Sequence, residues 1–227
     1  QVGVFLDISS LQQEDVLWLR LLTHLVGEVE TSEHTRAEIA VLNSRYLYNG
    51  RVYISLPGNA DEYHPYLRMS WISRDEDLAT GYDLMYEMLF DMDLTDASRV
   101  LELVQNARAS LRSSITSSPY SAQLYSSIGA WSELYGYYSY INYLPYYEFL
   151  TEVEQEINDD PEAVLAHLLA VRESINNAWN AVLLYAGSDS DRYSGSDDSA
   201  YIDTVVVARD SYLESESATP INEGNWP

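Results

Sequence analysis

The sequence of 227 residues contains no cysteine and no lysine. Without cysteine the chain has no disulfide scaffold, no thiolate metal site and no cysteine nucleophile. No apolar run reaches the roughly 18 residues that a membrane span needs, and no signal peptide precedes the first apolar segment, which favours a cytoplasmic location. A nucleophile elbow, a phosphate-binding glycine loop and an HxxEH or HxxxH zinc motif are also absent from the sequence. The sequence therefore predicts no catalytic site within this chain.

The net charge is strongly negative. The sequence contains 12 cationic residues, all arginine, and 36 acidic residues, which gives a net charge of −24. Such a surface does not neutralise a phosphate backbone, which argues against a nucleic-acid partner. The missing lysine has two explanations. Either the protein uses arginine alone, or lysines with a modification such as methylation are missing from the written sequence and the charge is less negative. An intact mass above 25.8 kDa would identify the second case.

The composition is that of a folded protein, with 46% hydrophobic residues. A chain of this length buries roughly 70% of its surface, enough for one large core or two small ones. It opens on Gln1 rather than methionine and stops at Pro227 in a stretch that resembles a linker. We therefore expect a piece of a longer protein.

Apolar periodicity predicts the order of the elements. Strand-like composition marks residues 2–8, 51–56, 64–73 and 181–186. Helical spacing marks a helix that Ser9 or Ser10 caps and that reaches residue 26, and then residues 33–42, 75–93, 95–117, 122–149, 161–175 and 201–213. A turn is predicted at Asn49-Gly50 and a solvated loop at residues 188–199.

These strands are too few and too unevenly spaced for a doubly wound parallel sheet. We expect an α+β fold in which residues 2–8, 64–73 and 181–186 form an antiparallel sheet. The helices within residues 10–42 and from residue 75 onward are expected to cover one face of it, because each carries a single apolar stripe. The predicted domain is 1–187, and residues 188–227 are expected to form an acidic loop, a helix and a linker toward a following domain.

Several segments carry a family resemblance through their order and spacing. The chain contains VGVFLDISSL, LVGEVETSEHT, HPYLRMSWIS and DEDLATGYDLMYEMLF, and later GAWSELYGYYSYINYLPYYEFL, DPEAVLAHLLAVRESI and AVLLYAG. Nearly the whole chain, to Gly187, resembles the presequence-protease branch of the pitrilysin-type (insulinase-like) zinc metallopeptidases. The resemblance implies the third, noncatalytic unit of an enzyme whose four α+β units enclose a chamber. It also implies zinc in the parent's first domain, and no cofactor in this fragment.

The zinc motif of that family can be compared with this sequence. If Thr31 is aligned with the threonine that follows the family's zinc helix, the HxxEH positions fall on residues 21–25. Leu21 and Leu25 then occupy the two ligand positions, and His24 occupies the position of the general base. Leucine offers no lone pair, so we expect no zinc site and no catalytic residue here.

Other polar residues have competing interpretations. His24 and Glu28 are four residues apart and could ligate a metal, but a polar pair beside the leucine stripe is the simpler interpretation. Glu33-His34 follows a helix end, where capping or solvation explains it better than catalysis. Residues 189–198 resemble a calcium loop only weakly, because Tyr193 stands at the fifth position.

Tyrosines are concentrated in one stretch, where Tyr135, Tyr137, Tyr138, Tyr140, Tyr143, Tyr146 and Tyr147 occur. Their rings combine large apolar faces with a polar tip, which suits contact with extended peptides. We single out the first five as candidates for peptide or inter-domain contact. Packing within a helical hairpin is the alternative.

Two functions stay open. The first is a noncatalytic, chamber-forming domain of a zinc metalloendopeptidase that degrades short or unfolded peptides, with the other domains of the parent chain and peptide substrates as partners and no nucleic acid or membrane. The second is a stand-alone peptide- or protein-binding module with the same fold. An HxxEH motif upstream in the parent gene would support the first.

Overall fold

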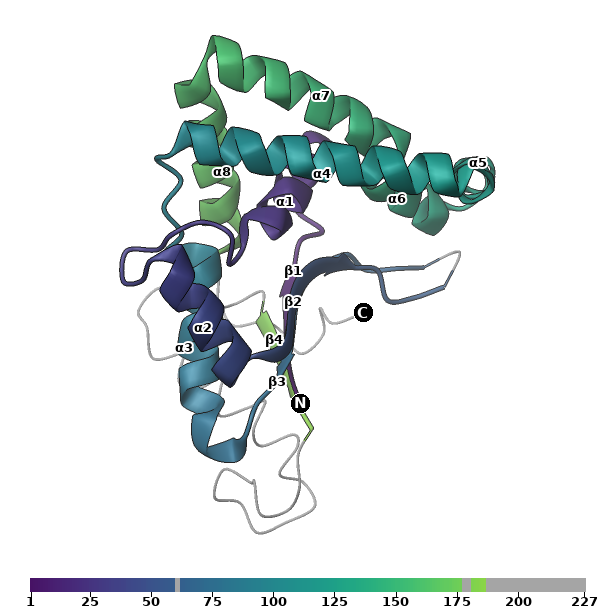
Figure 1. Cartoon of the computed structure of the whole chain (residues 1–227). Coiled ribbons are helices and arrows are strands. Elements are labelled where there is room, and N and C mark those ends of the chain that lie inside the picture. The colour runs from purple at the N-terminus through teal and green to yellow at the C-terminus, as the bar shows by residue number, and fades with distance from the viewer. Residues whose placement is uncertain (60–61, 177–180, 187–227) are drawn as a thin grey trace.

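The computed structural model describes residues 1–59, 62–176 and 181–186 (Figure 1). In chain order its elements are β1 (Val2–Asp7), α1 (Gln13–Leu25), α2 (Arg36–Tyr46), β2 (Tyr48–Ser55), β3 (Tyr66–Ile72), the 3-10 turn η1 (Asp75–Asp77), α3 (Leu78–Phe90), α4 (Ala97–Ser117), α5 (Pro119–Gly129), α6 (Glu133–Asn142), α7 (Leu144–Asp159), α8 (Pro161–Ile175) and β4 (Ala181–Tyr185). The helix and loop expected beyond residue 187 lie outside the described residues. No described helix has the length and apolar character that crossing a membrane requires.

The four strands form one antiparallel sheet in the order β2-β3-β1-β4. The α+β class and the antiparallel pairing of the first, third and last predicted strands are therefore confirmed. The second predicted strand joins the same sheet as β2, at the edge beside β3. The register sets Val4 opposite Met69 and Leu6 opposite Leu67, so alternate residues of β1 and β3 share one apolar face.

The opposite face of the sheet carries longer polar and aromatic side chains. Phe5 pairs with Arg68, and Arg68 pairs with Tyr53 across the next strand. The guanidinium of Arg68 lies 4.9 Å from the ring centre of Phe5 and 5.7 Å from that of Tyr53. These stacked groups cover the middle of this face, while the helices lie against the other.

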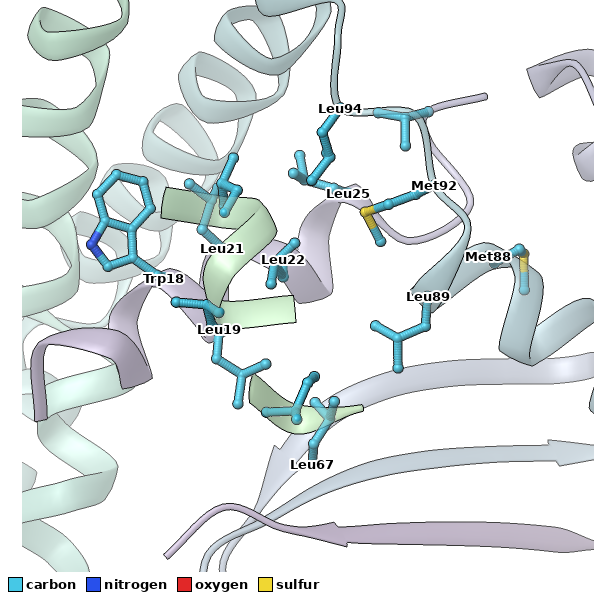
Figure 2. Close-up of a cluster of buried hydrophobic side chains, with 14 of the residues drawn as sticks. Trp18, Leu19, Leu21, Leu22, Leu25, Leu67, Met88, Leu89, Met92 and Leu94 are labelled. Atoms are coloured by element: carbon cyan, nitrogen blue, oxygen red, sulfur yellow. The ribbon is translucent and has the colours of Figure 1, made fainter. Parts of the chain in front are cut away.

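Helix α1 is the centre of the hydrophobic core. Its buried residues are Val16, Leu17, Trp18, Leu19, Leu21, Leu22 and Leu25. Four consecutive residues point in directions that span most of a helical turn, so α1 is buried on several sides and not along one stripe. Figure 2 shows its leucines together with Met88 and Leu89 of α3, above Leu67 of the sheet. The apolar stripe that the sequence predicts for this helix consists of Leu17, Leu21, Leu22, Leu25 and Val26, and it omits Trp18 and Leu19.

The later helices form a second helical layer over α1. Helices α4 and α8 contact α1, and α7 packs against both α4 and α8 (Figure 1). The indole of Trp18 joins the two layers, with the ring of Phe149 at 5.0 Å and that of His167 at 4.4 Å. The α+β fold with helices on one face of an antiparallel sheet is confirmed, and within it the helices from α4 onward pack chiefly on α1 and on one another. The cause is the all-round apolar surface of α1, which offers these helices a place to bury their own stripes.

Two predicted helix starts are displaced. Helix α1 begins at Gln13, later than a cap at Ser9 or Ser10 implies, because Ser9 donates both its backbone N–H and its hydroxyl to the Asp7 carboxylate. This local turn ends β1 instead of opening the helix. Helix α4 is capped by Asp96, whose carboxylate accepts from the Arg99 N–H at 3.1 Å, and not by Thr95.

The turn predicted at Asn49-Gly50 lies inside β2. The pairing of β2 with β3 shifts between Tyr48 and Arg51, and Asn49 has a φ of 54°. Asparagine tolerates this left-handed conformation, so the two residues form an irregularity of the strand and not a connection before it.

The loop between α1 and α2 depends on the spacing of its polar residues. The Thr31 hydroxyl and the His34 ring both contact the Glu87 carboxylate of α3, with His34 Nδ1 at 2.9 Å from Glu87 Oε1. Thr35 and Glu38 form a reciprocal capping box at the start of α2. These contacts hold the loop against α3 and set the start of α2 at Arg36.

Truncation of Leu22, which is 0% exposed, tests the central position of α1. We expect Leu22→Ala to lower the free energy of unfolding by about 2–5 kcal/mol, since the cavity is enclosed by both layers. Urea denaturation measures the change. Val41→Ala on α2, where the side chain is 64% exposed, is the control and is expected to stay within about 0.5 kcal/mol of the wild type. A similar loss in both variants would contradict the central role of α1.

Candidate functional site

The residues aligned with a zinc motif lie in the core. Leu21 and Leu25 are fully buried, and both contribute to the cluster between the sheet and the second helical layer (Figure 2). Within the described part of the chain, no three histidine, cysteine or acidic side chains lie close enough together to hold a metal ion. The side chains at these positions therefore supply packing and no metal ligand.

His24 lies beside the ring of Tyr146. The two rings are nearly parallel at 6.2 Å, and the Arg20 guanidinium lies 5.4 Å from the centre of the Tyr146 ring. Burial, together with the positive charge of Arg20, lowers the pKa of His24 to about 4. His24 is therefore neutral at neutral pH, and burial raises the pKa of the Tyr146 hydroxyl.

The other polar candidates have structural partners. Glu28 is exposed and pairs with Arg99 of α4 at 3.1 Å, which separates it from His24. Glu33 is exposed. His34 is held by Glu87, whose hydrogen bond and negative charge raise the pKa of the imidazole. These contacts join the loop after α1 to α3 and α4.

The tyrosines divide into two groups. Tyr125 of α5, which the sequence analysis did not single out, is the centre of the first group. Its ring lies 5.9 Å from Tyr135, 4.8 Å from Tyr138 and 5.7 Å from Tyr143. This group joins α5, α6 and the start of α7 at the end of the second layer that is remote from α8 (Figure 1).

The second group faces the rest of the domain. Tyr137 lies 5.8 Å from the ring of Tyr63, next to β3, and the Tyr140 hydroxyl donates to the Gln13 carbonyl at 3.2 Å. Tyr146 is buried within the second layer. All five tyrosines proposed for contact thus have internal ring or hydrogen-bond partners; Tyr138 is in addition exposed, and Tyr135 and Tyr143 are half-buried.

The α5–α6 hairpin presents an exposed apolar surface. Helix α5 contains no buried residue. The large exposed side chains of this region, which we call the apolar hairpin surface, are Tyr120, Leu124, Trp131, Tyr138 and Leu144. Trp131 is 92% exposed and Tyr120 is 75% exposed. A gathering of large exposed apolar side chains on one hairpin is typical of interaction sites. Sequence reasoning missed Trp131 because it treated residues 122–149 as one helical unit, and Tyr120 lies just before that range.

The hairpin is closed by a contact between two glycines. A Cβ atom on Gly129 would lie 2.9 Å from the Cα atom of Gly136, so no side chain fits between α5 and α6 at this point. The close approach fixes the angle between the two helices and the position of the apolar hairpin surface.

A family profile described as associated with the peptidases of family M16, subfamily C, matches residues 2–153, which is most of the described chain. The chain belongs to this peptidase-associated family. The matched region includes the sheet strands β1 to β3, α1 and the apolar hairpin surface. Membership places this domain among the accessory domains of the pitrilysin-type metallopeptidases.

A curated relative of this peptidase-associated domain is Protein HypA of Clostridium perfringens (strain 13 / Type A). The two are 22% identical over 194 residues, which cover 84% of this chain and 20% of the relative. The chain thus spans about a fifth of the length of the relative that it matches.

Zinc analysis tests the interpretation of α1. We expect the purified chain to retain no stoichiometric zinc after dialysis, because Leu21 and Leu25 offer no lone pairs and lie in the core. Atomic emission on the dialysed protein measures the content. One zinc ion retained per chain would contradict this expectation.

The pH dependence of stability tests the burial of His24. Since the pKa falls from 6.5 in the unfolded chain to about 4 in the folded chain, the unfolded state gains the proton first as the pH falls. The stability that neutral His24 contributes is complete above pH 6.5 and is lost toward pH 4, by up to about 3 kcal/mol. Urea denaturation at several pH values should show this loss in the wild type and not in His24→Gln. An equal pH dependence in both proteins would contradict it.

Proposed function

We propose that this domain is a noncatalytic, chamber-forming unit of a presequence-protease-like zinc metallopeptidase that degrades short or unfolded peptides. In that enzyme it would occupy the third of four related units. Membership of the peptidase-associated family supports an accessory role, and the leucines at the aligned zinc positions support the absence of catalysis here. Zinc would be held by the first unit of the parent protein.

The observation that carries the proposal is the apolar hairpin surface. An aromatic side chain as exposed as Trp131 gains free energy when a partner covers it, and Tyr120 and Leu124 are also exposed on this hairpin. The domain spans a fifth of its relative's length, so a much larger polypeptide is available as that partner. We propose that another domain of the parent chain packs on this surface and that the contact helps to close the chamber.

The large negative net charge favours a small apolar interface over a large one. With a net charge of −24, a large interface would bring many carboxylates together unless the partner were basic. The hairpin surface concentrates aromatic and leucine side chains at one end of the domain, where a small patch can be buried with few charges.

Substitution of Trp131 in the intact parent protein tests the proposal. We expect Trp131→Ser to weaken the contact between domains, which would raise the rate of limited proteolysis at domain boundaries and lower peptidase activity at least several-fold. The side chain is 92% exposed, so the stability of this domain itself should not change.

Val41→Ser, at an exposed site on α2 away from the hairpin, is the matched control. It should leave proteolysis and activity at the wild-type level. If Trp131→Ser also leaves both unchanged, the hairpin does not hold a neighbouring domain. If the parent protein shows no peptidase activity and contains no HxxEH motif, the alternative of a binding module applies instead.

A further inference from the structure

A cleft lies between α1, α2, α3 and the edge strand β2. Its volume is about 470 Å³, and it is open to solvent on one side. The polar lining includes Arg20, Thr23 and His24 from α1, Asn43 from α2 and Arg51 from β2. This volume is in the range of small-ligand sites and suits a group the size of one or two amino-acid residues.

The charge inside the cleft is opposite to that of the protein. Acidic residues outnumber cations three to one in the sequence, yet among the described residues that line the cleft none is acidic and two are arginines. Neither Arg20 nor Arg51 forms an ion pair within the described ranges. Of the other eight arginines in the described ranges, four, at positions 74, 99, 108 and 172, do form such pairs. The cleft thus retains positive charge that the rest of the fold does not neutralise.

The two arginines are held in different ways. Arg20 donates to the Thr23 hydroxyl at 2.8 Å and lies over the Tyr146 ring, which fixes its guanidinium while leaving other N–H groups available. Arg51 is exposed on the edge strand, where the register sets its side chain on the same face as Tyr53 and opposite to Val52, so its guanidinium can enter the cleft only around the edge of β2. A fixed guanidinium paired with a mobile one can grip the two oxygens of a carboxylate.

The remaining lining is apolar. Met85 and Met88 of α3 are buried, and Val26 and Val52 complete this part of the cleft. Methionine adapts its shape to different apolar groups, so the cleft accepts aliphatic bodies of several sizes. A bare inorganic anion would leave this apolar lining unfilled.

We infer that the cleft binds a carboxylate carried on a small aliphatic body, as at the C-terminal residue of a peptide or in a free acylated amino acid. Neutral His24 would contribute a hydrogen-bonding ring nitrogen beside the arginines. The inference concerns only residues of this chain, and it holds whether or not the parent protein is an active peptidase.

Calorimetric titration of the intact protein at low ionic strength, with N-acetyl-leucine as the probe, tests the inference. We expect N-acetyl-leucine to bind, and N-acetyl-leucinamide, acetate and inorganic phosphate to bind at least tenfold more weakly, since each lacks the carboxylate or the apolar body. Equal binding of the amide, or tighter binding of phosphate, would overturn the inference.

Two variants localise the binding. Arg51→Gln removes the mobile cation, and Asn43→Asp adds a negative charge in an isosteric side chain; both should weaken N-acetyl-leucine about tenfold or more. Arg45→Gln is the matched control, because Arg45 is also exposed and stacks only on its neighbour Tyr46 at 5.0 Å. Unchanged affinity in Arg51→Gln and Asn43→Asp, or an equal loss in Arg45→Gln, would overturn the assignment to this cleft.

The same titration distinguishes the two sources of the carboxylate. A blocked tripeptide that ends in leucine should bind more tightly than N-acetyl-leucine if the cleft receives peptide ends, because its backbone can reach the outer edge of β2, which pairs with no other described strand. Equal affinity would assign the cleft to a free acylated amino acid. Absence of binding by both probes would refute the inference.

Discussion

The burial of α1 on all sides is the constraint on which the fold depends. The sheet and α3 contact one side of this helix, and α4 and α8 contact the other. Each fully buried leucine contributes roughly 1.5–3 kcal/mol, and α1 supplies four, at positions 19, 21, 22 and 25. Their sum is comparable with the whole net stability of a typical domain, about 5–15 kcal/mol.

This constraint also decides what the helix can do chemically. A histidine at position 21 or 25 would be an imidazole buried between two apolar layers, at a desolvation cost that the packing does not offset. The same residues therefore cannot both hold the layers together and ligate a metal. The chain belongs to a peptidase-associated family, and in it these two positions serve packing.

The sequence predicted the sheet well, because strands depend on a local alternation that the registers of β1 and β3 confirm. It predicted the helices but not their layers, since a single-stripe interpretation of residues 17–26 ignores Trp18 and Leu19, and only tertiary contacts reveal an all-round apolar helix. The tyrosine cluster was recognised, whereas its centre Tyr125 and the exposed Trp131 were not. The positions of Tyr125 and Trp131 depend on the contact between Gly129 and Gly136, which brings α5 and α6 together.

The position of β1 between β3 and β4 has a consequence for how the chain reaches its native state. β1 is synthesised first, but one of its two partners, β4, begins at residue 181. Closing a loop of that length carries a large entropic cost, which is met only after the intervening helices have condensed. Until then one edge of β1 has exposed N–H and C=O groups, and a nascent chain in this state is open to pairing with another strand. When β4 pairs with β1, it therefore completes the sheet and also protects this edge of β1 from pairing with another chain.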